Sequence, residues 1–351
     1  MLELFCLCWR WRQASVSVNT EVLRLTLFCV RIDCKVVEQY RLRGVNLTKP
    51  LELDFDFECH TLGLACARAK LRLDPKAPAI FRDAYQGYRG LRAFPSYYER
   101  KWLSLRLSAI KRGMVLALAV NAAFLERITP KFCPVTLEAL DTGSKTSNNP
   151  SVDRLVNEGT YAAGNLCMFS IRANQAKADM NFEDVAKIAT TMEAHGKLKP
   201  IEWMRLASLM YGAWCESVGA EDPHIVPFVT YPSPNLFTTQ SQTVQWLLLR
   251  HCRAEVWPDS LQVWLAATHD AGGSVDEFMQ MASSLKAALE LEEYPPSAWY
   301  RPAVFKPFAA WYLQSKECIR PLLEARRDKY QSGVDTADIV ARWKVGSRYQ
   351  I

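Results

Sequence analysis

The chain has 351 residues, of which 49% are hydrophobic and 23% charged, and its formal net charge is +6. These proportions are ordinary for a soluble globular protein, and the length suffices for two or three domains. The mild basic excess is compatible with a nucleic-acid partner without establishing one.

The termini and cysteines argue against a secreted or membrane-spanning chain. Met1 to Cys8 is apolar apart from Glu3, but Arg10 and Arg12 follow at once, so we expect no signal peptide. The longest apolar run, Met114 to Leu125, is too short to cross a bilayer and contains Asn121. Eleven cysteines in a chain of this length predict reduced, mostly buried thiols. We therefore expect a cytoplasmic protein with no membrane contact.

The first 75 residues are predicted to be rich in β-structure. Val22 to Val30 carries β-branched and aromatic residues, and Leu51 to Phe57 alternates strictly between apolar and acidic side chains. The carboxylates of Glu52, Asp54 and Asp56 then share one face of a strand. We interpret that face as solvated, with a metal-binding acidic strand as the alternative.

Residues 76–100 combine prolines with several tyrosines and predict a linker or an irregular collar. Tyrosines interleaved with Arg82, Arg89 and Arg92 can stack on bases or pack on the next domain, and we favour packing.

Residues 97–131 predict one or two basic helices. This stretch has seven Lys or Arg residues against two Glu residues, and its apolar positions are loosely helical in spacing. A basic helix can hold a nucleic-acid backbone, and we name Lys111 and Arg112 as contacts. The alternative is an ordinary solvated amphipathic face.

Residues 151–177 carry the chemistry on which the functional hypothesis depends, and they predict strand, loop, strand and helix in succession. Asp153 falls in the first strand and Asn174 in the helix. A carboxylate and an amide oxygen are hard ligands that suit Mg²⁺ or another divalent cation. Lys177 lies one turn beyond Asn174 and can meet a phosphate, while Asn165 opens the second strand and can fix the loop.

The order Asp153-Arg154, Tyr161, Gly164-Asn165-Leu166, Asn174-x-x-Lys177 resembles the ββα-metal module of the HNH endonucleases. The upstream segment Cys133-Pro-Val-Thr136 resembles the entry to the same module. The resemblance implies a DNA-cleaving enzyme in which Asp153 and Asn174 hold the metal and Asn165 is the central asparagine of the motif. It also implies that Lys177 and Arg172 accompany the site as nucleic-acid contacts.

The position after Asp153 departs from that pattern. The HNH motif has a histidine there as general base, whereas this chain has Arg154, which cannot take up a proton and can instead clamp a phosphate. Two hypotheses follow, a metal-dependent endonuclease with Asp153, Arg154 and Asn165 as catalytic residues, or a non-catalytic nucleic-acid-binding or interaction protein that retains the scaffold. A weaker third hypothesis is a helical interaction protein. Cys133 and Cys167 lack paired neighbours, so we predict no structural zinc.

From residue 181 onward the chain predicts helices. Asn181 to Asp184 matches a capping box, Pro200 suits a first helical turn, and Ser274 with Glu277 matches another cap. The sequence therefore predicts an α+β protein in three parts, namely a β-rich region at 1–96, a basic helix with the ββα module at 97–180, and a helical domain at 181–351.

Overall fold

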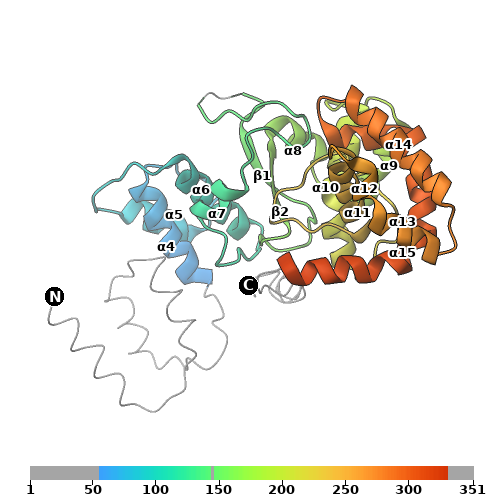
Figure 1. Ribbon diagram of the computed structural model, residues 1–351. Coiled ribbons are helices and arrows are strands. Elements are labelled where there is room, and N and C mark those ends of the chain that lie inside the picture. Colours follow the sequence, from blue (N-terminus) through green and yellow to red (C-terminus); the bar gives the residue numbers. More distant parts are fainter. Residues whose placement is uncertain (1–54, 144–145, 331–351) are drawn as a thin grey trace, which may run out of the picture. The chain divides into compact units, whose positions relative to one another are not determined.

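The computed structural model describes residues 55–143 and 146–330, which fold as helices with one two-stranded sheet (Figure 1). The elements up to the sheet and its helix are α4 (Phe55–Arg68), α5 (Ala79–Gly87), α6 (Tyr97–Lys111), α7 (Ala122–Ile128), β1 (Pro150–Arg154), β2 (Leu166–Ser170) and α8 (Ile171–Lys177). The later elements are α9 (Phe182–Thr191), α10 (Pro200–Val218), α11 (Gln240–Cys252), α12 (Trp257–Ser260), α13 (Gln262–Asp270), α14 (Val275–Leu291), the 3₁₀-helix η2 (Pro295–Tyr300) and α15 (Pro302–Tyr330). Among these described helices, none is long and apolar enough to cross a membrane.

The first described element corrects the prediction of β-structure up to residue 75. Helix α4 begins at Phe55, within the alternating stretch, and buries Cys59, Leu62 and Cys66. These positions are three and four residues apart, so they line one side of a helix, and their packing outweighs the short alternation. The predicted strand at 22–30, with Glu52 and Asp54, lies outside the described residues.

Residues 76–100 also differ from the predicted linker, because α5 and the start of α6 lie within them. Helix α6 begins with a reciprocal capping box, in which the Glu99 amide donates to Ser96 Oγ at 3.1 Å and the Ser96 amide donates to Glu99 Oε2 at 2.6 Å. Helices α6 and α7 confirm the helical prediction for residues 97–131.

The two strands pair antiparallel, with Asp153 opposite Cys167 and Arg154 opposite Leu166. All five residues of β2 are buried. Leu166 packs with residues of α6 and α7, whereas Cys167 and Phe169 pack with α9 and α10. Since successive strand residues point to opposite faces, β2 lies between two apolar clusters, which explains its continuous apolar sequence.

The helices after residue 181 follow the prediction closely. Asn181 and Asp184 form the expected capping box of α9, Pro200 is in the first turn of α10, and the Glu277 amide donates to Ser274 Oγ at 3.2 Å. Helix α10 is buried along most of its length and contributes Trp203, among others, to the core shared with β2. The remaining helices, α11 to α15, build a second, Trp-rich core.

Gly212 in α10 gives a direct test of this packing. A Cβ atom there would overlap the carbonyl oxygen of Phe237, so we expect Gly212→Ala to lower the free energy of unfolding by about 1–3 kcal/mol. Gly87→Ala is the matched control, because no atom lies within 4 Å of its Cβ position. Urea unfolding of the control should show stability unchanged or raised by up to about 1 kcal/mol. Equal stability of Gly212→Ala and wild type would contradict the close packing of α10.

Candidate functional site

Helix α8 lies against one face of β1, and two pairs of polar side chains join them. Ser151 and Asp153 are two residues apart in the strand and share that face, while Asn174 and Lys177 are three apart and share one side of the helix. Asn174 Nδ2 donates to Ser151 Oγ at 2.7 Å. The Lys177 ammonium lies 3.0 Å from Asp153 Oδ2. The helix is thus held in one register along the strand.

The Lys177 side chain is completely buried, and its charge is compensated by two oxygens. Besides Asp153, the ammonium donates to Asn157 Oδ1 at 3.0 Å. Asn157 is in turn fixed by its donation to the Asp179 carbonyl at 2.7 Å. The Asp153 side chain is only 14% exposed. An isolated charge in such a place would be costly, so each ion of the pair depends on the other.

Burial has the largest effect on the pKa of the Asp153 carboxyl group. Removal from water raises the pKa of this carboxyl above its usual value, and the nearby Lys177 ammonium and Arg154 act in the opposite direction. The ammonium is therefore what favours the ionised carboxylate at this position.

Asn165 is fully buried, and its side chain closes the loop between the strands. Its Oδ1 accepts from the Val156 amide at 2.8 Å, and its Nδ2 donates to the carbonyls of Val156 and Thr160, each at 3.0 Å. A Cβ atom at Gly159 would lie 2.6 Å from Asn165 Nδ2, so glycine permits this close approach. The structure therefore gives Asn165 the loop-fixing function that the sequence suggested, and its amide group is occupied by backbone.

Arg154 points away from α8, because it follows Asp153 in the strand. Its guanidinium lies 4.6 Å from the centroid of the Tyr161 ring, and its Nη1 donates to the Gly159 carbonyl at 3.1 Å. Arg112, at the end of α6, donates to the Tyr161 hydroxyl. Tyr161 thus brings together two of the arginines that the sequence named as nucleic-acid contacts. Neither arginine forms an ion pair with any residue that the structure describes.

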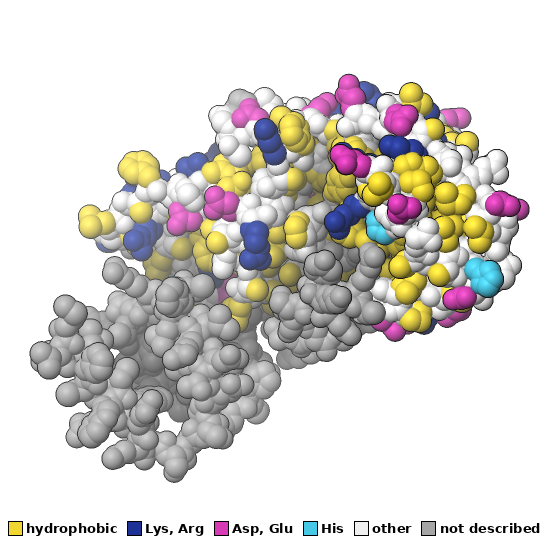
Figure 2. Space-filling model, viewed as in Figure 1, with side chains coloured by type: hydrophobic (Ala, Val, Ile, Leu, Met, Phe, Trp, Pro, Cys, Tyr) yellow, Lys and Arg dark blue, Asp and Glu magenta, His cyan; other side chains and the backbone are white. Residues whose placement is uncertain are grey.

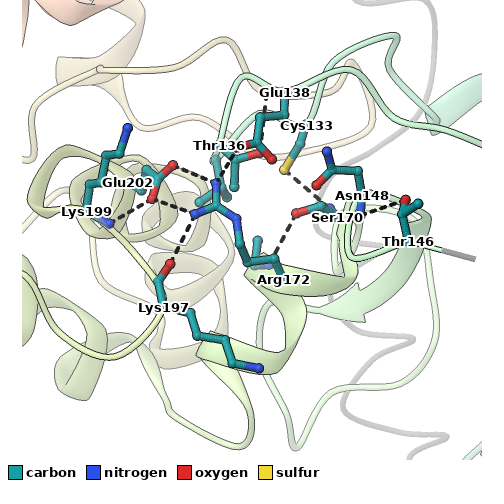
Figure 3. Close-up of polar contacts among 12 residues, drawn as sticks. Cys133, Thr136, Glu138, Thr146, Asn148, Ser170, Arg172, Lys197, Lys199 and Glu202 are labelled. Atoms are coloured by element: carbon teal, nitrogen blue, oxygen red, sulfur yellow. Dashed lines mark hydrogen bonds and ion pairs between the residues drawn. The ribbon is translucent and has the colours of Figure 1, made fainter.

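The other predicted nucleic-acid contacts have partners within the fold. Figure 3 shows the Arg172 guanidinium between Glu202, Glu138 and the Lys197 carbonyl, with distances of 3.0, 3.1 and 3.1 Å. Because Glu202 belongs to α10 and is 3% exposed, Arg172 ties α8 to the helical core. Lys111 pairs with Asp74 at 2.6 Å.

Three contributors to this site were missed by sequence reasoning. Ser151 fixes Asn174, Asn157 shares the Lys177 ammonium, and Tyr161 holds Arg112 and Arg154. Serine and asparagine are common in turns, and no sequence pattern identifies the partners of Ser151 and Asn157. Tyr161 was part of the quoted motif, but its contact with Arg112 joins positions 49 residues apart.

The polar groups of Asp153 and Asn174, the two predicted metal ligands, have partners within the fold. Asp153 and Asn174 lie on one interface, where Asp153 Oδ2 is paired with the Lys177 ammonium and Asn174 Nδ2 donates to Ser151 Oγ. A Mg²⁺ ion at Asp153 Oδ2 would compete with the Lys177 ammonium 3.0 Å away, so we derive no catalytic step through a metal.

Comparison with known proteins assigns the chain to no family. No protein-family model, curated protein or solved structure matches the chain.

Lys177→Met tests the buried ion pair. Removing the ammonium leaves an uncompensated buried carboxylate, so at neutral pH we expect the free energy of unfolding to fall by about 3–5 kcal/mol. In the folded variant the Asp153 pKa is raised further, so the folded state holds the proton more tightly than the unfolded state. Stability is therefore lost as the pH rises from about 3.8, the usual value, through that raised pKa.

The double variant Asp153→Asn with Lys177→Met is the matched control, since it removes both charges. Urea unfolding at several pH values should show that it recovers much of the lost stability and no longer has the pH-dependent loss. A Lys177→Met penalty that is the same at acid and neutral pH would contradict the ion pair.

Proposed function

We propose that this protein binds nucleic acid, and that its ββα unit is a frame for binding rather than a hydrolytic centre. The observation that carries the proposal is the pair Arg112 and Arg154 held by Tyr161. Both guanidinium groups lack an ion-pair partner among the described residues and keep donors available for phosphate oxygens. Arginine forks of this kind suit the phosphodiester backbone.

The distribution of charge supports the same proposal. Residues 55–131 contain fourteen Lys and Arg against six Asp and Glu, whereas residues 132–351 contain twenty-one against twenty-five. The basic excess of the protein is thus concentrated in the part that contributes Arg112. A polyanion is attracted by such a local excess even when the whole chain is only mildly basic. The proposal includes a cytoplasmic location, which is the expectation from the sequence.

The geometry of β1 is the reason for favouring binding over hydrolysis. Asp153 faces α8 and is paired with Lys177, whereas Arg154 faces Tyr161 on the other side of the strand. A phosphate gripped by Arg154 would therefore not lie against the Asp153 carboxylate. Arg154 also cannot act as the general base.

A second candidate is metal-dependent phosphodiester hydrolysis of the HNH type. It is favoured by the succession of β1, β2 and α8 and by the shared interface of Asp153 and Asn174. If Lys177 moved away, Asp153 and Asn174 would be the residues to hold Mg²⁺, which would supply charge stabilisation at phosphate. This candidate requires a metal ion to compete with the Lys177 ammonium for the Asp153 carboxylate, and the first candidate does not.

Salt-dependent binding tests the first proposal. Fluorescence anisotropy with a labelled DNA duplex, and separately with RNA, should show affinity that falls with salt concentration. Arg112→Gln should reduce the slope of log K against log salt by about 0.9, and the double variant with Arg154→Gln by about twice that. Arg154→Lys, which keeps the charge, should restore part of the double variant's loss.

The control is Arg250→Gln, an exposed arginine of α11 that should leave the slope unchanged. The double variant Asp153→Asn with Lys177→Met, which removes both buried charges, should bind as wild type does. Absence of binding at low salt would refute the proposal, whereas Mg²⁺-dependent cleavage by wild type that this double variant lacks would establish the second candidate in its place.

A further inference from the structure

The loop between α5 and α6, residues 88–95, exposes two large apolar side chains. Leu91 is 91% exposed and Phe94 is 86% exposed. Figure 2 shows hydrophobic side chains standing out beside Lys and Arg in the part of the molecule formed by α4 to α6. Exposed apolar side chains on a loop tip are candidates for contact with a partner.

The loop is held in shape from within. The Tyr88 hydroxyl donates to the Leu91 carbonyl at 2.7 Å, and the Ala93 amide donates to the Arg68 carbonyl at the end of α4 at 2.8 Å. Gly90 packs so closely that a Cβ atom would lie 2.6 Å from the Tyr88 hydroxyl. The capping box of α6 follows directly. Leu91 and Phe94 are therefore presented by a pre-organised loop, which reduces the entropy lost on binding.

The surroundings of this loop are basic. Residues 84–98 contain two arginines and no acid, and the end of α4 with the residues just after it adds Arg68, Lys70 and Arg72. All five of these cations, Arg68, Lys70, Arg72, Arg89 and Arg92, are exposed. Throughout the described chain, none of the five forms an ion pair. The Lys70 ammonium lies 4.3 Å from the centroid of the Phe94 ring. The charge complements a polyanion at the position where the apolar side chains project.

We infer that Phe94 and Leu91 form a wedge that contacts unpaired or unstacked bases, while Arg89, Arg92 and Lys70 contact the flanking phosphates. This rests on the proposed nucleic-acid binding and names its substrate class, namely nucleic acid with bases accessible outside a continuous stack. An aromatic face among arginines suits base stacking, and a small apolar wedge suits an opened base step. Two side chains bury too little area for stable attachment to a bilayer, for which even one myristoyl chain is marginal.

The test compares a fully paired duplex with the same duplex carrying an unpaired central bubble, and with the single strand. Wild type should bind the bubble and single strand more tightly than the duplex. The double variant Leu91→Ser with Phe94→Ser should lose at least about fivefold in affinity for those two and less than about twofold for the duplex. Leu291→Ser, an apolar residue 70% exposed at the end of α14, is the matched control and should change neither affinity.

Phe94→Trp supplies a second measurement that does not depend on a loss of affinity. Since tryptophan also stacks, this variant should retain the preference for the bubble. Equal affinity of wild type for bubble and duplex, or equal losses on both in the double variant, would overturn the wedge while leaving nucleic-acid binding intact. Binding to phosphatidylserine vesicles that requires Leu91 and Phe94, without a bubble preference, would overturn it in favour of a membrane surface. Failure of wild type to bind any nucleic acid would remove the proposed function itself.

Discussion

The buried ion pair between Lys177 and Asp153 is the constraint on which the rest of this site depends. An ammonium without solvent contact must be compensated, and here the Asp153 carboxylate and the Asn157 amide oxygen do so at 3.0 Å each. The pair fixes α8 along β1, and the Asn174–Ser151 hydrogen bond repeats the same register one turn earlier. Arg172 then ties this helix to α10 through Glu202. The buried ion pair holds β1 to α8, and the Arg172–Glu202 ion pair holds α8 to α10, so the small sheet is connected to the helical core.

The alternation of β1 separates two kinds of chemistry that the sequence suggested would act together. Asp153 faces inward to α8, and Arg154 faces the Tyr161 side, where Arg112 also arrives. The first face is closed by internal partners, whereas the second keeps two arginines without an ion pair among the described residues. This division is the reason for proposing phosphate binding rather than phosphate hydrolysis. Under the proposed function, the surface that contacts nucleic acid includes the end of α6, which contributes Arg112.

Much of the local structure could be predicted from the sequence, because it depends on short-range patterns. The hairpin and helix of residues 150–177 and the caps at Asn181 and Ser274 follow from turn residues, apolar runs and side-chain spacing. The stretch around Phe55 was wrongly predicted as a strand, since seven alternating residues outweighed the helical spacing that begins at Cys59. Packing of α4 against α5 and α6 decides between helix and strand for this stretch. A sequence segment of seven residues does not reveal such tertiary contacts.

Several residues of the candidate site could be predicted from the sequence, but the side chains that each of them contacts could not. Asp153, Asn174 and Lys177 do meet at one interface, yet spacing alone could not show that Lys177 would face Asp153 or that Asn157 would complete the contact. Likewise Lys111 and Arg172 were chosen for their charge, and their partners Asp74 and Glu202 lie 37 and 30 residues away. Side-chain pairing over such separations is a property of the tertiary fold.

The most direct test of the central claim is a titration of the isotopically labelled protein with Mn²⁺, followed by NMR line broadening. Since the Lys177 ammonium lies 3.0 Å from Asp153 Oδ2, we expect the resonances of Asp153, Asn174 and Lys177 to stay sharp when Mn²⁺ is added in slight excess. Selective broadening of these three resonances would show a metal ion bound at the carboxylate and would contradict a carboxylate closed by its ion pair.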